Sequence, residues 1–384
     1  MSAPPTPGVS SSPPRLNALG RARHFWQRIS EGRQVDELWS HFTADARASY
    51  SFYMKEADSE GLGTHRGFKR WIRICKILFW SMLMKMTPAR RVLLLVALLL
   101  LVVSGMKFTF NNVSTEANFG PVGVFLLLLL LSLELADKVT MKRDLEIARE
   151  IQSWLVPSQP PEVVGANIAF ATRPQNSVAG DYYDAFYPNA EDREKLMVVI
   201  ADVAGKSVPA ALLMATLQAS LRTIAGENAP LADLVARLNL YACAHSLNGL
   251  RFTTAVLSEY NPVSRRLTYV NAGHNAPILR HANGALETLE VGGMPLGIQP
   301  ATNYETASLE LKPGDALIFF TDGVVEAFNE SGEEFGNERW LSAIRNLPDW
   351  DAQQTLQYLM KQVDEFVGAT RQSDDITCLV FRSK

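Results

Sequence analysis

The chain of 384 residues carries aspartates where apolar strands are expected to begin or end. Asp202 and Asp322 each directly follow an apolar run, while Asp374 and Asp375 directly precede another. If the third run is antiparallel to the other two, its start lies beside their ends, and the carboxylates meet at one edge of a sheet. Asp181 can join them from a turn. The spacing therefore predicts a cluster of acidic side chains.

Such a cluster has the chemistry of a site for divalent cations. Carboxylates that meet at one point repel each other, so their pKa values rise unless a cation neutralises them. Oxygen ligands select Mg²⁺ or Mn²⁺ over zinc, and two such ions can bind a phosphoryl group and activate a water. The alternative is that Asp at a strand end only marks a turn. Two further features favour a metal site over simple turns: a further candidate ligand, Asp184, and the adjacent glycines Gly180, Gly205 and Gly323.

Other phosphate and nucleophile chemistries fit the sequence less well. Gly205-Lys206-Ser207 looks like the end of a phosphate-binding P-loop, but the glycine required five residues earlier is Ile200, inside a predicted strand. None of the three cysteines has an arginine six residues downstream, which disfavours a thiol-based phosphatase, and their scattered positions fit a reducing compartment. His274 lies in a predicted turn and is either a hydrogen-bonded loop residue or a catalytic one.

The elements that must position these residues lie after Pro157. Short apolar strands alternate there with turns and amphipathic helices. The predicted strands are 194–201, 252–259, 266–271, 276–281, 306–311, 315–320 and 376–382, and the predicted helices are 208–225, 231–247, 338–346 and 352–367. This pattern indicates a mixed α+β domain over residues 158–384.

The first 135 residues differ in composition from this domain. Residues 1–20 are rich in Pro, Ser and Gly, which indicates disorder. Residues 21–91 read as a basic, helical, cytoplasmic juxtamembrane region. Two apolar runs, at 92–106 and 119–135, predict a hairpin of two transmembrane helices across 92–135, with buried core helices as the alternative.

Charge predicts the orientation of this hairpin. Residues 1–91 contain 15 Lys and Arg against 7 Asp and Glu, although the whole chain has a net charge of −3. Basic residues flank the outer ends of both apolar runs, so both chain termini are expected in the cytoplasm and the protein in the cytoplasmic membrane with two spans. We interpret the basic region as facing the bilayer rather than nucleic acid.

A charged, helix-favouring connector covers residues 136–157 and ends at Pro157, where a helix stops readily. Its apolar residues lie near one side, which allows a parallel coiled coil and a homodimer. Fewer than three heptads are present, so a single helix and a dimer both stay open.

The ordered motifs after residue 147 resemble the PPM-type phosphatases of the bacterial SpoIIE-like branch. The matching stretches include Ala148-Arg-Glu-Ile-Gln, Val178-Ala-Gly-Asp, Ala201-Asp-Val-Ala-Gly-Lys, Asn271-Ala-Gly-His-Asn, Phe320-Thr-Asp-Gly-Val and Ser373-Asp-Asp-Ile-Thr. The resemblance implies an α-β-β-α sandwich of two antiparallel sheets with two Mn²⁺ or Mg²⁺ ions at one edge. It also implies a protein-serine/threonine phosphatase that uses metal-activated water.

The resemblance assigns roles to residues of this chain. Asp202 and Asp181 are the expected catalytic residues, and the expected metal ligands are Asp181, Asp202, the Val203 carbonyl, Asp322, Asp374 and Asp375. Asp375 ranks below Asp374. Gly180, Gly205, His274 and Gly323 are expected to support the site or the substrate.

The resemblance also suggests a substrate, namely a phosphorylated signalling protein such as an anti-sigma-factor antagonist. A non-catalytic membrane scaffold that binds a phosphoprotein is one alternative function, and a metal-dependent hydrolase of a small phosphoester or nucleotide is another. Two positions depart from the usual motifs, because Ala179 and Ser207 stand where relatives commonly carry glycine. We expect Ser207 to act as the N-cap of the following helix.

Overall fold

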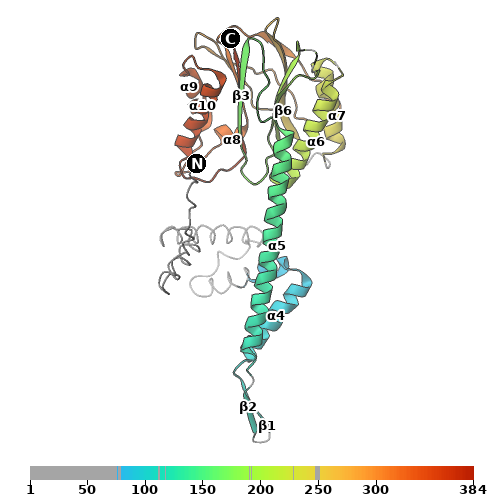
Figure 1. Ribbon diagram of the computed structural model, residues 1–384, viewed down its shortest axis with the longest axis vertical. Helices are drawn as coiled ribbons and strands as arrows, with labels where there is room; N and C mark the ends of the chain where they lie inside the picture. The colour runs from blue at the N-terminus through green and yellow to red at the C-terminus, as the bar shows by residue number, and fades with distance from the viewer. Residues whose placement is uncertain are drawn as a thin grey trace, which may run out of the picture. The chain divides into compact units, whose positions relative to one another are not determined.

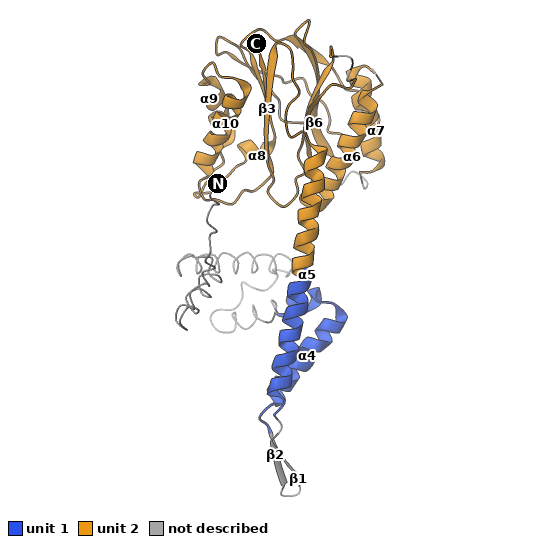
Figure 2. Ribbon diagram, viewed as in Figure 1, with its two compact units in different colours: residues 1–137 blue, residues 138–384 orange. Residues whose placement is uncertain are grey.

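The computed structural model describes residues 76, 79–110, 113–116, 118–189, 191, 193–227, 229–246 and 251–384, with backbone only for 107–110 and 113–116 (Figure 1). The predictions for residues 1–20 and for most of 21–91 lie outside these residues. The chain divides into two compact units, residues 1–137 and 138–384 (Figure 2).

The described part of the first unit contains helix α4 (Pro88–Val103), a hairpin of strands β1 (Lys107–Phe110) and β2 (Val113–Glu116), and the start of helix α5 (Gly120–Leu155). The two helices approach closely at Gly123, where a Cβ atom would lie 3.0 Å from the Ala97 carbonyl oxygen. Arg90 of α4 pairs with Glu134 and Asp137 of α5. The connection between the two helices is largely a β-hairpin.

The second unit is built on two five-stranded antiparallel sheets. The first has the order β10-β7-β6-β5-β4 and the second the order β3-β12-β11-β8-β9. The strands of the first are β4 (Tyr182–Phe186), β5 (Leu196–Val203), β6 (Thr253–Asn261), β7 (Arg266–Ala272) and β10 (Ala307–Glu310). Those of the second are β3 (Ala166–Arg173), β8 (Ile278–Arg280), β9 (Leu286–Thr288), β11 (Ala316–Phe320) and β12 (Ile376–Ser383).

Helices cover the outer faces of both sheets. Helices α6 (Val208–Ala225) and α7 (Leu231–Ala244) pack on the first sheet, and α8 (Asp322–Val325), α9 (Gly336–Arg345) and α10 (Ala352–Val367) lie on the side of the second (Figure 1). One apolar core lies between the sheets, and one lies between each sheet and its helices. The expected α-β-β-α sandwich is therefore confirmed.

Hydropathy and length select one described helix as able to cross a bilayer, and it is α6. This helix packs against β5 in the second unit and buries Ala210, Met214 and Leu221 there. Helix α4 has 16 residues, fewer than the roughly 20 that a spanning helix needs. The expectation of two spans at 92–106 and 119–135 is therefore not confirmed.

The predicted and observed elements of the second unit agree best in the long helices, where the apolar periodicity extends over several turns. Helices α6 and α10 have the predicted bounds, whereas β3, β4, β9 and the short α8 were not predicted. Strand β5 ends at Val203 rather than residue 201, so Asp202 lies inside the strand and pairs with Thr254. Aspartate is unusual in strands, which explains why the sequence pattern ended this strand too early.

Candidate active site

Asp202 points from β5 into the space between the sheets. Side chains alternate along a strand, and Val198 and Ile200 on the same face belong to the core between the two sheets. A Cβ atom on Gly180 would lie 3.7 Å from Asp202 Oδ1 and 3.2 Å from the Val203 carbonyl oxygen. The glycine therefore keeps a second loop close to both expected ligands.

Burial raises the pKa of Asp202 to about 7, and repulsion from Asp322, Asp374 and Asp375 adds to this rise. Burial also raises the pKa of Asp181 well above its usual range, with repulsion from Asp202 as the next cause. The carboxylates thus lie close enough to disturb one another's ionisation. These aspartates therefore lie near one another, and their role as metal ligands stays a prediction.

Asp181 lies directly before β4 and is almost fully buried. Thr321, the residue after β11, donates its hydroxyl to Asp181 Oδ2 at 3.0 Å. The backbone N–H of Thr377 on β12 donates to the same hydroxyl oxygen at 3.0 Å. A small polar bridge therefore connects the two sheets beside Asp181, which sequence spacing could not predict.

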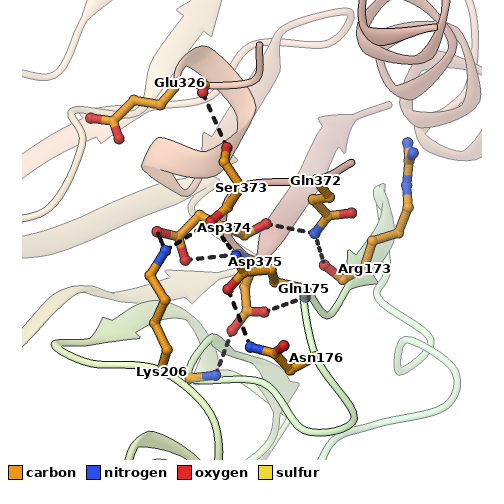
Figure 3. Close-up of polar contacts among 10 residues, drawn as sticks. Arg173, Gln175, Asn176, Lys206, Glu326, Gln372, Ser373, Asp374 and Asp375 are labelled. Atoms are coloured by element: carbon orange, nitrogen blue, oxygen red, sulfur yellow. Dashed lines mark hydrogen bonds and ion pairs between the residues drawn. The ribbon is translucent and has the colours of Figure 1, made fainter. Parts of the chain in front are cut away.

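Asp375 holds two loops together through its carboxylate (Figure 3). Oδ1 accepts the backbone N–H of Gln175 and Oδ2 that of Gly180, both at 2.6 Å. Burial nevertheless raises the pKa of Asp375. These two bonds give Asp375 a clear positioning role.

Asp374 faces a different set of partners. Its Oδ1 accepts the backbone N–H of Asp375 at 2.9 Å, and its Oδ2 lies 2.9 Å from Lys206 Nζ. The Lys206 ammonium also donates to the Ser373 carbonyl oxygen at 2.7 Å (Figure 3). Lys206, set aside when the P-loop was rejected, is therefore a site residue that sequence reasoning missed.

Asp322 begins α8 immediately after Thr321. Burial raises the pKa of Asp322, and repulsion from Asp374 adds to the rise. A Cβ atom on Gly323 would lie 1.9 Å from the Asp375 carbonyl oxygen, so a side chain at this position would displace the loop that carries Asp374. The glycine is therefore required for close approach of the two acidic segments.

The acidic side chains form no ready-made ligand shell. Among the described residues, no group of three His, Cys, Asp or Glu side chains is arranged to hold a metal ion. The donor chemistry nevertheless fits a hard divalent cation, because the donors are oxygen atoms and burial raises the pKa of Asp181, Asp202, Asp322 and Asp375. A bound cation would relieve this repulsion.

His274 lies beside this cluster and contacts it through Thr254. Its Nδ1 is 2.8 Å from Thr254 Oγ1, which lies 3.5 Å from the Asp202 carbonyl oxygen. The Asn271 side chain bonds both the N–H and the carbonyl oxygen of His274. Burial lowers the pKa of His274 to about 4, so the imidazole is neutral at pH 7. Of the two roles left open, this geometry favours a hydrogen-bonded loop residue.

Asp184 does not join the cluster, contrary to expectation. It is fully buried on β4, where Arg222 of α6 binds both carboxylate oxygens at 2.9 Å and the Tyr182 hydroxyl donates at 2.6 Å. The Arg222 guanidinium also stacks over the Phe186 ring at 4.3 Å. Asp184 therefore joins a helix to a sheet. It was a candidate because residues 181–184 looked like a turn, whereas β4 begins at Tyr182.

Gln152 near the end of α5 is another contact that the sequence did not reveal. Its side-chain amide donates to the Ala179 carbonyl oxygen at 2.7 Å and accepts the Ala179 N–H at 2.9 Å. Ala179 precedes Gly180 and Asp181, so the connector helix holds the loop that carries a candidate ligand. The backbone at Ala179 is not left-handed, which explains why an alanine replaces the usual glycine there without strain.

Comparison with known proteins places these features in context. The family described as Stage II sporulation protein E (SpoIIE) matches residues 192–384. Protein IcfG of Synechocystis sp. is 28% identical over 284 residues, which cover 66% of this chain and 44% of that protein. Phosphoserine phosphatase RsbU of Bacillus subtilis is 28% identical over 193 residues, which cover 50% of this chain and 56% of RsbU. The chain thus matches about half the length of these relatives.

Two solved structures share the fold. The SiaA-PP2C domain of Pseudomonas aeruginosa superimposes with a TM-score of 0.55 at 22% identity, covering 65% of this chain and 99% of that domain. The PP2C phosphatase domain of SpoIIE from Bacillus subtilis, solved with a fragment of its regulatory domain, gives a TM-score of 0.51 at 20% identity and covers 58% of this chain and 64% of that one.

Proposed function

Because the chain belongs to the SpoIIE family of PP2C-type phosphatases, we propose that it is a metal-dependent protein phosphatase that hydrolyses phosphoserine or phosphothreonine. One observation carries the proposal: burial and mutual repulsion raise the pKa values of aspartates from three separate segments of the chain. A protein tolerates such uncompensated buried charge where the charge has a function.

The residues divide into ligands and supports. Asp202 and the Val203 carbonyl would help to hold one ion, and Asp322 and Asp374 would help to hold the second. Asp181 would supply a further, partly indirect contact. When bound, Mn²⁺ or Mg²⁺ ions would lower the pKa of a water molecule and offset the charge of the phosphoryl group. Asp375 holds the Gln175 and Gly180 loops in place through their N–H groups.

The test is Mn²⁺-dependent phosphate release from a phosphoserine protein by the Asp202→Ala variant. We expect activity to fall by at least about 100-fold, in the range seen when one transition-state contact is removed. Asp233→Ala, which removes an exposed aspartate from α7, is the matched control and should retain activity. Unchanged activity of Asp202→Ala would contradict the proposal.

The substrate proposed from the family resemblance is a phosphorylated signalling protein such as an anti-sigma-factor antagonist. Phosphoproteomics of a deletion strain should reveal one or a few phosphoserine sites that become more occupied. The competing function is a scaffold that binds a phosphoprotein without hydrolysing it. Binding of the phosphoprotein by the wild-type chain without phosphate release, in the presence of Mn²⁺, would favour the scaffold.

We further propose that the first unit anchors the chain in the membrane. Large apolar side chains of α4 and α5 are exposed there, which is unusual on a water-facing surface. They include Val92, Leu99, Val102, Phe125, Leu128 and Leu131, each at least 57% exposed. Reporters fused at residues 60 and 384 should both behave as cytoplasmic. A reporter signal from the opposite side of the membrane at either position would overturn this topology.

A homodimer through the connector is the remaining proposal. Ile147, Ile151 and Trp154 of α5 follow one another at intervals of four and three residues and are 46%, 49% and 73% exposed. This spacing puts them on one helix face, as a two-helix interface requires. Ile151→Asp should shift the full chain from dimer to monomer in light scattering, whereas Glu150→Gln should not. A monomeric wild-type chain would contradict the proposal.

A further inference from the structure

Lys206 lies on the loop between β5 and α6, four residues after Asp202, and its side chain reaches across to the loop that carries Asp374 (Figure 3). The ammonium contacts Asp374 Oδ2 at 2.9 Å and the Ser373 carbonyl oxygen at 2.7 Å. The side chains are partly open to solvent, with 51% exposure for Lys206 and 36% for Asp374. The ion pair can therefore separate without unfolding its surroundings.

The backbone on both sides of Lys206 is unusual. Gly205 has φ = +118°, and a Cβ atom there would lie 2.2 Å from Arg251 Nη1. Ser207 has φ = 64° and ψ = −146°, a conformation that is normally restricted to glycine. These two residues turn the chain sharply between the strand and the helix. The sharp turn tethers the Lys206 cation to the strand that carries Asp202.

The field of this cation reaches more than one carboxylate. Burial raises the pKa of Asp322, repulsion from Asp374 adds to the rise, and Lys206 opposes it. The same ammonium opposes the rise that burial and Asp322 cause in the pKa of Glu326. Through its contacts with the Asp374 carboxylate and the Ser373 carbonyl oxygen, Lys206 is the counter-ion in the Asp322–Asp374 half of the cluster, where the second divalent ion is expected.

We propose that Lys206 is a tethered counter-ion that competes with the divalent cation for the Asp322–Asp374 half of the site. This inference rests on the metal-dependent function proposed above. Carboxylate oxygens have several lone pairs, so the ammonium does not block Asp374 Oδ2 sterically. A divalent ion on the same oxygen would instead place two positive centres within a few ångströms, and their repulsion would expel the flexible ammonium.

Two consequences follow from this competition. The Asp322–Asp374 half binds a divalent cation more weakly than its carboxylates alone would allow, so occupancy of the second ion becomes sensitive to the ambient metal concentration. The first ion, on the Asp181–Asp202 half, is affected less. Added salt reduces the effect of Lys206 on cation affinity, because the Lys206–Asp374 pair is partly exposed to solvent.

The test is a calorimetric titration of the metal-free, full-length chain with Mn²⁺. Lys206→Met keeps the length of the side chain and removes its charge, and it should tighten the weaker site by about fivefold, the effect of losing a partly exposed ion pair. Lys206→Arg keeps the charge and should stay within about twofold of wild type. Lys195→Met removes a lysine that pairs with Glu259 at the other end of β5, and its Mn²⁺ affinities should match wild type.

The outcomes separate this inference from the proposed function. If the wild-type chain binds two Mn²⁺ ions and Lys206→Met binds the second no more tightly, the competition is disproved and the phosphatase proposal stands. If the wild-type chain binds no Mn²⁺, both are disproved. Thermal unfolding of each metal-free variant checks that the comparison is made between folded proteins.

Discussion

Asp181 and Asp184 are three residues apart, both are buried, and their surroundings differ completely. Asp184 is neutralised by Arg222 and accepts the Tyr182 hydroxyl, so its charge is paired inside the fold. Asp181 has a threonine hydroxyl and faces other carboxylates, and burial raises its pKa well above the usual range. A buried paired aspartate therefore supports the fold, whereas a buried unpaired one marks the site where a cation is expected.

The largest expected effect on stability is at the paired aspartate. Arg222→Met leaves the Asp184 carboxylate buried without its cation and should lower the free energy of unfolding by about 3 kcal/mol. The control is Arg237→Met, because Arg237 pairs with Glu227 at the surface, where both side chains are over 40% exposed. Its loss should cost less than about 1 kcal/mol in urea unfolding. Equal losses for both variants would show that burial of Asp184 does not matter.

Replacing the unpaired aspartate should raise the free energy of unfolding rather than lower it. Asp181→Asn removes a buried charge and keeps an oxygen that can accept the Thr321 hydroxyl. The metal-free variant should therefore gain about 1 kcal/mol in the free energy of unfolding, a gain typical of functional residues replaced by neutral ones. With Mn²⁺ present the wild-type chain should be more stable than Asp181→Asn, because it has the stronger metal ligand. A loss of stability without metal would mean that Asp181 is compensated after all.

The pH dependence of stability should distinguish the unpaired acidic cluster from the paired Asp184. The folded-state pKa of Asp202 is raised to about 7 from an ordinary value near 3.8, so the folded state holds the proton more tightly than the unfolded state. The stabilisation of the folded state that results from this proton is fully present below about pH 4 and is lost as the pH rises through about 7. The melting temperature of the metal-free chain should fall across this window, and Asp202→Asn should flatten the change. A melting temperature that rises with pH across this window would contradict the raised pKa of Asp202.

The sequence predicted the parts of this site that local patterns determine. Strand-end aspartates indicated the cluster, and long periodic helices such as α6 and α10 were predicted to the residue. Contacts between distant segments were not predictable, because the partner of a side chain depends on which loops the fold brings together. The Gln152 amide on Ala179 and the Asp375 carboxylate on Gln175 and Gly180 are of this kind.

The role expected for Ser207 was wrong for a local reason. It occupies the position before α6, but in the described structure its side chain makes no capping hydrogen bond, and its φ of 64° prevents the usual extended N-cap geometry. The sequence contained a signal for this outcome, because relatives commonly carry glycine at this position. A left-handed backbone requirement explains that preference, whereas a helix cap does not.

A similarly small effect is expected from this backbone. Ser207→Gly should relieve strain of about 1–3 kcal/mol. It also gives the unfolded chain more freedom, which offsets about 0.5–1 kcal/mol of the gain, so the net increase in the free energy of unfolding should be about 1 kcal/mol. The control is Arg265→Gly, since Arg265 also has a positive φ, 53°, in a turn between β6 and β7. Left-handed turn positions are tolerated better than the conformation at Ser207, so its gain in urea unfolding should be smaller. If Ser207→Gly gives no gain, the loop between Asp202 and α6 is not strained, and the acidic edge stores its unfavourable energy in its charges alone.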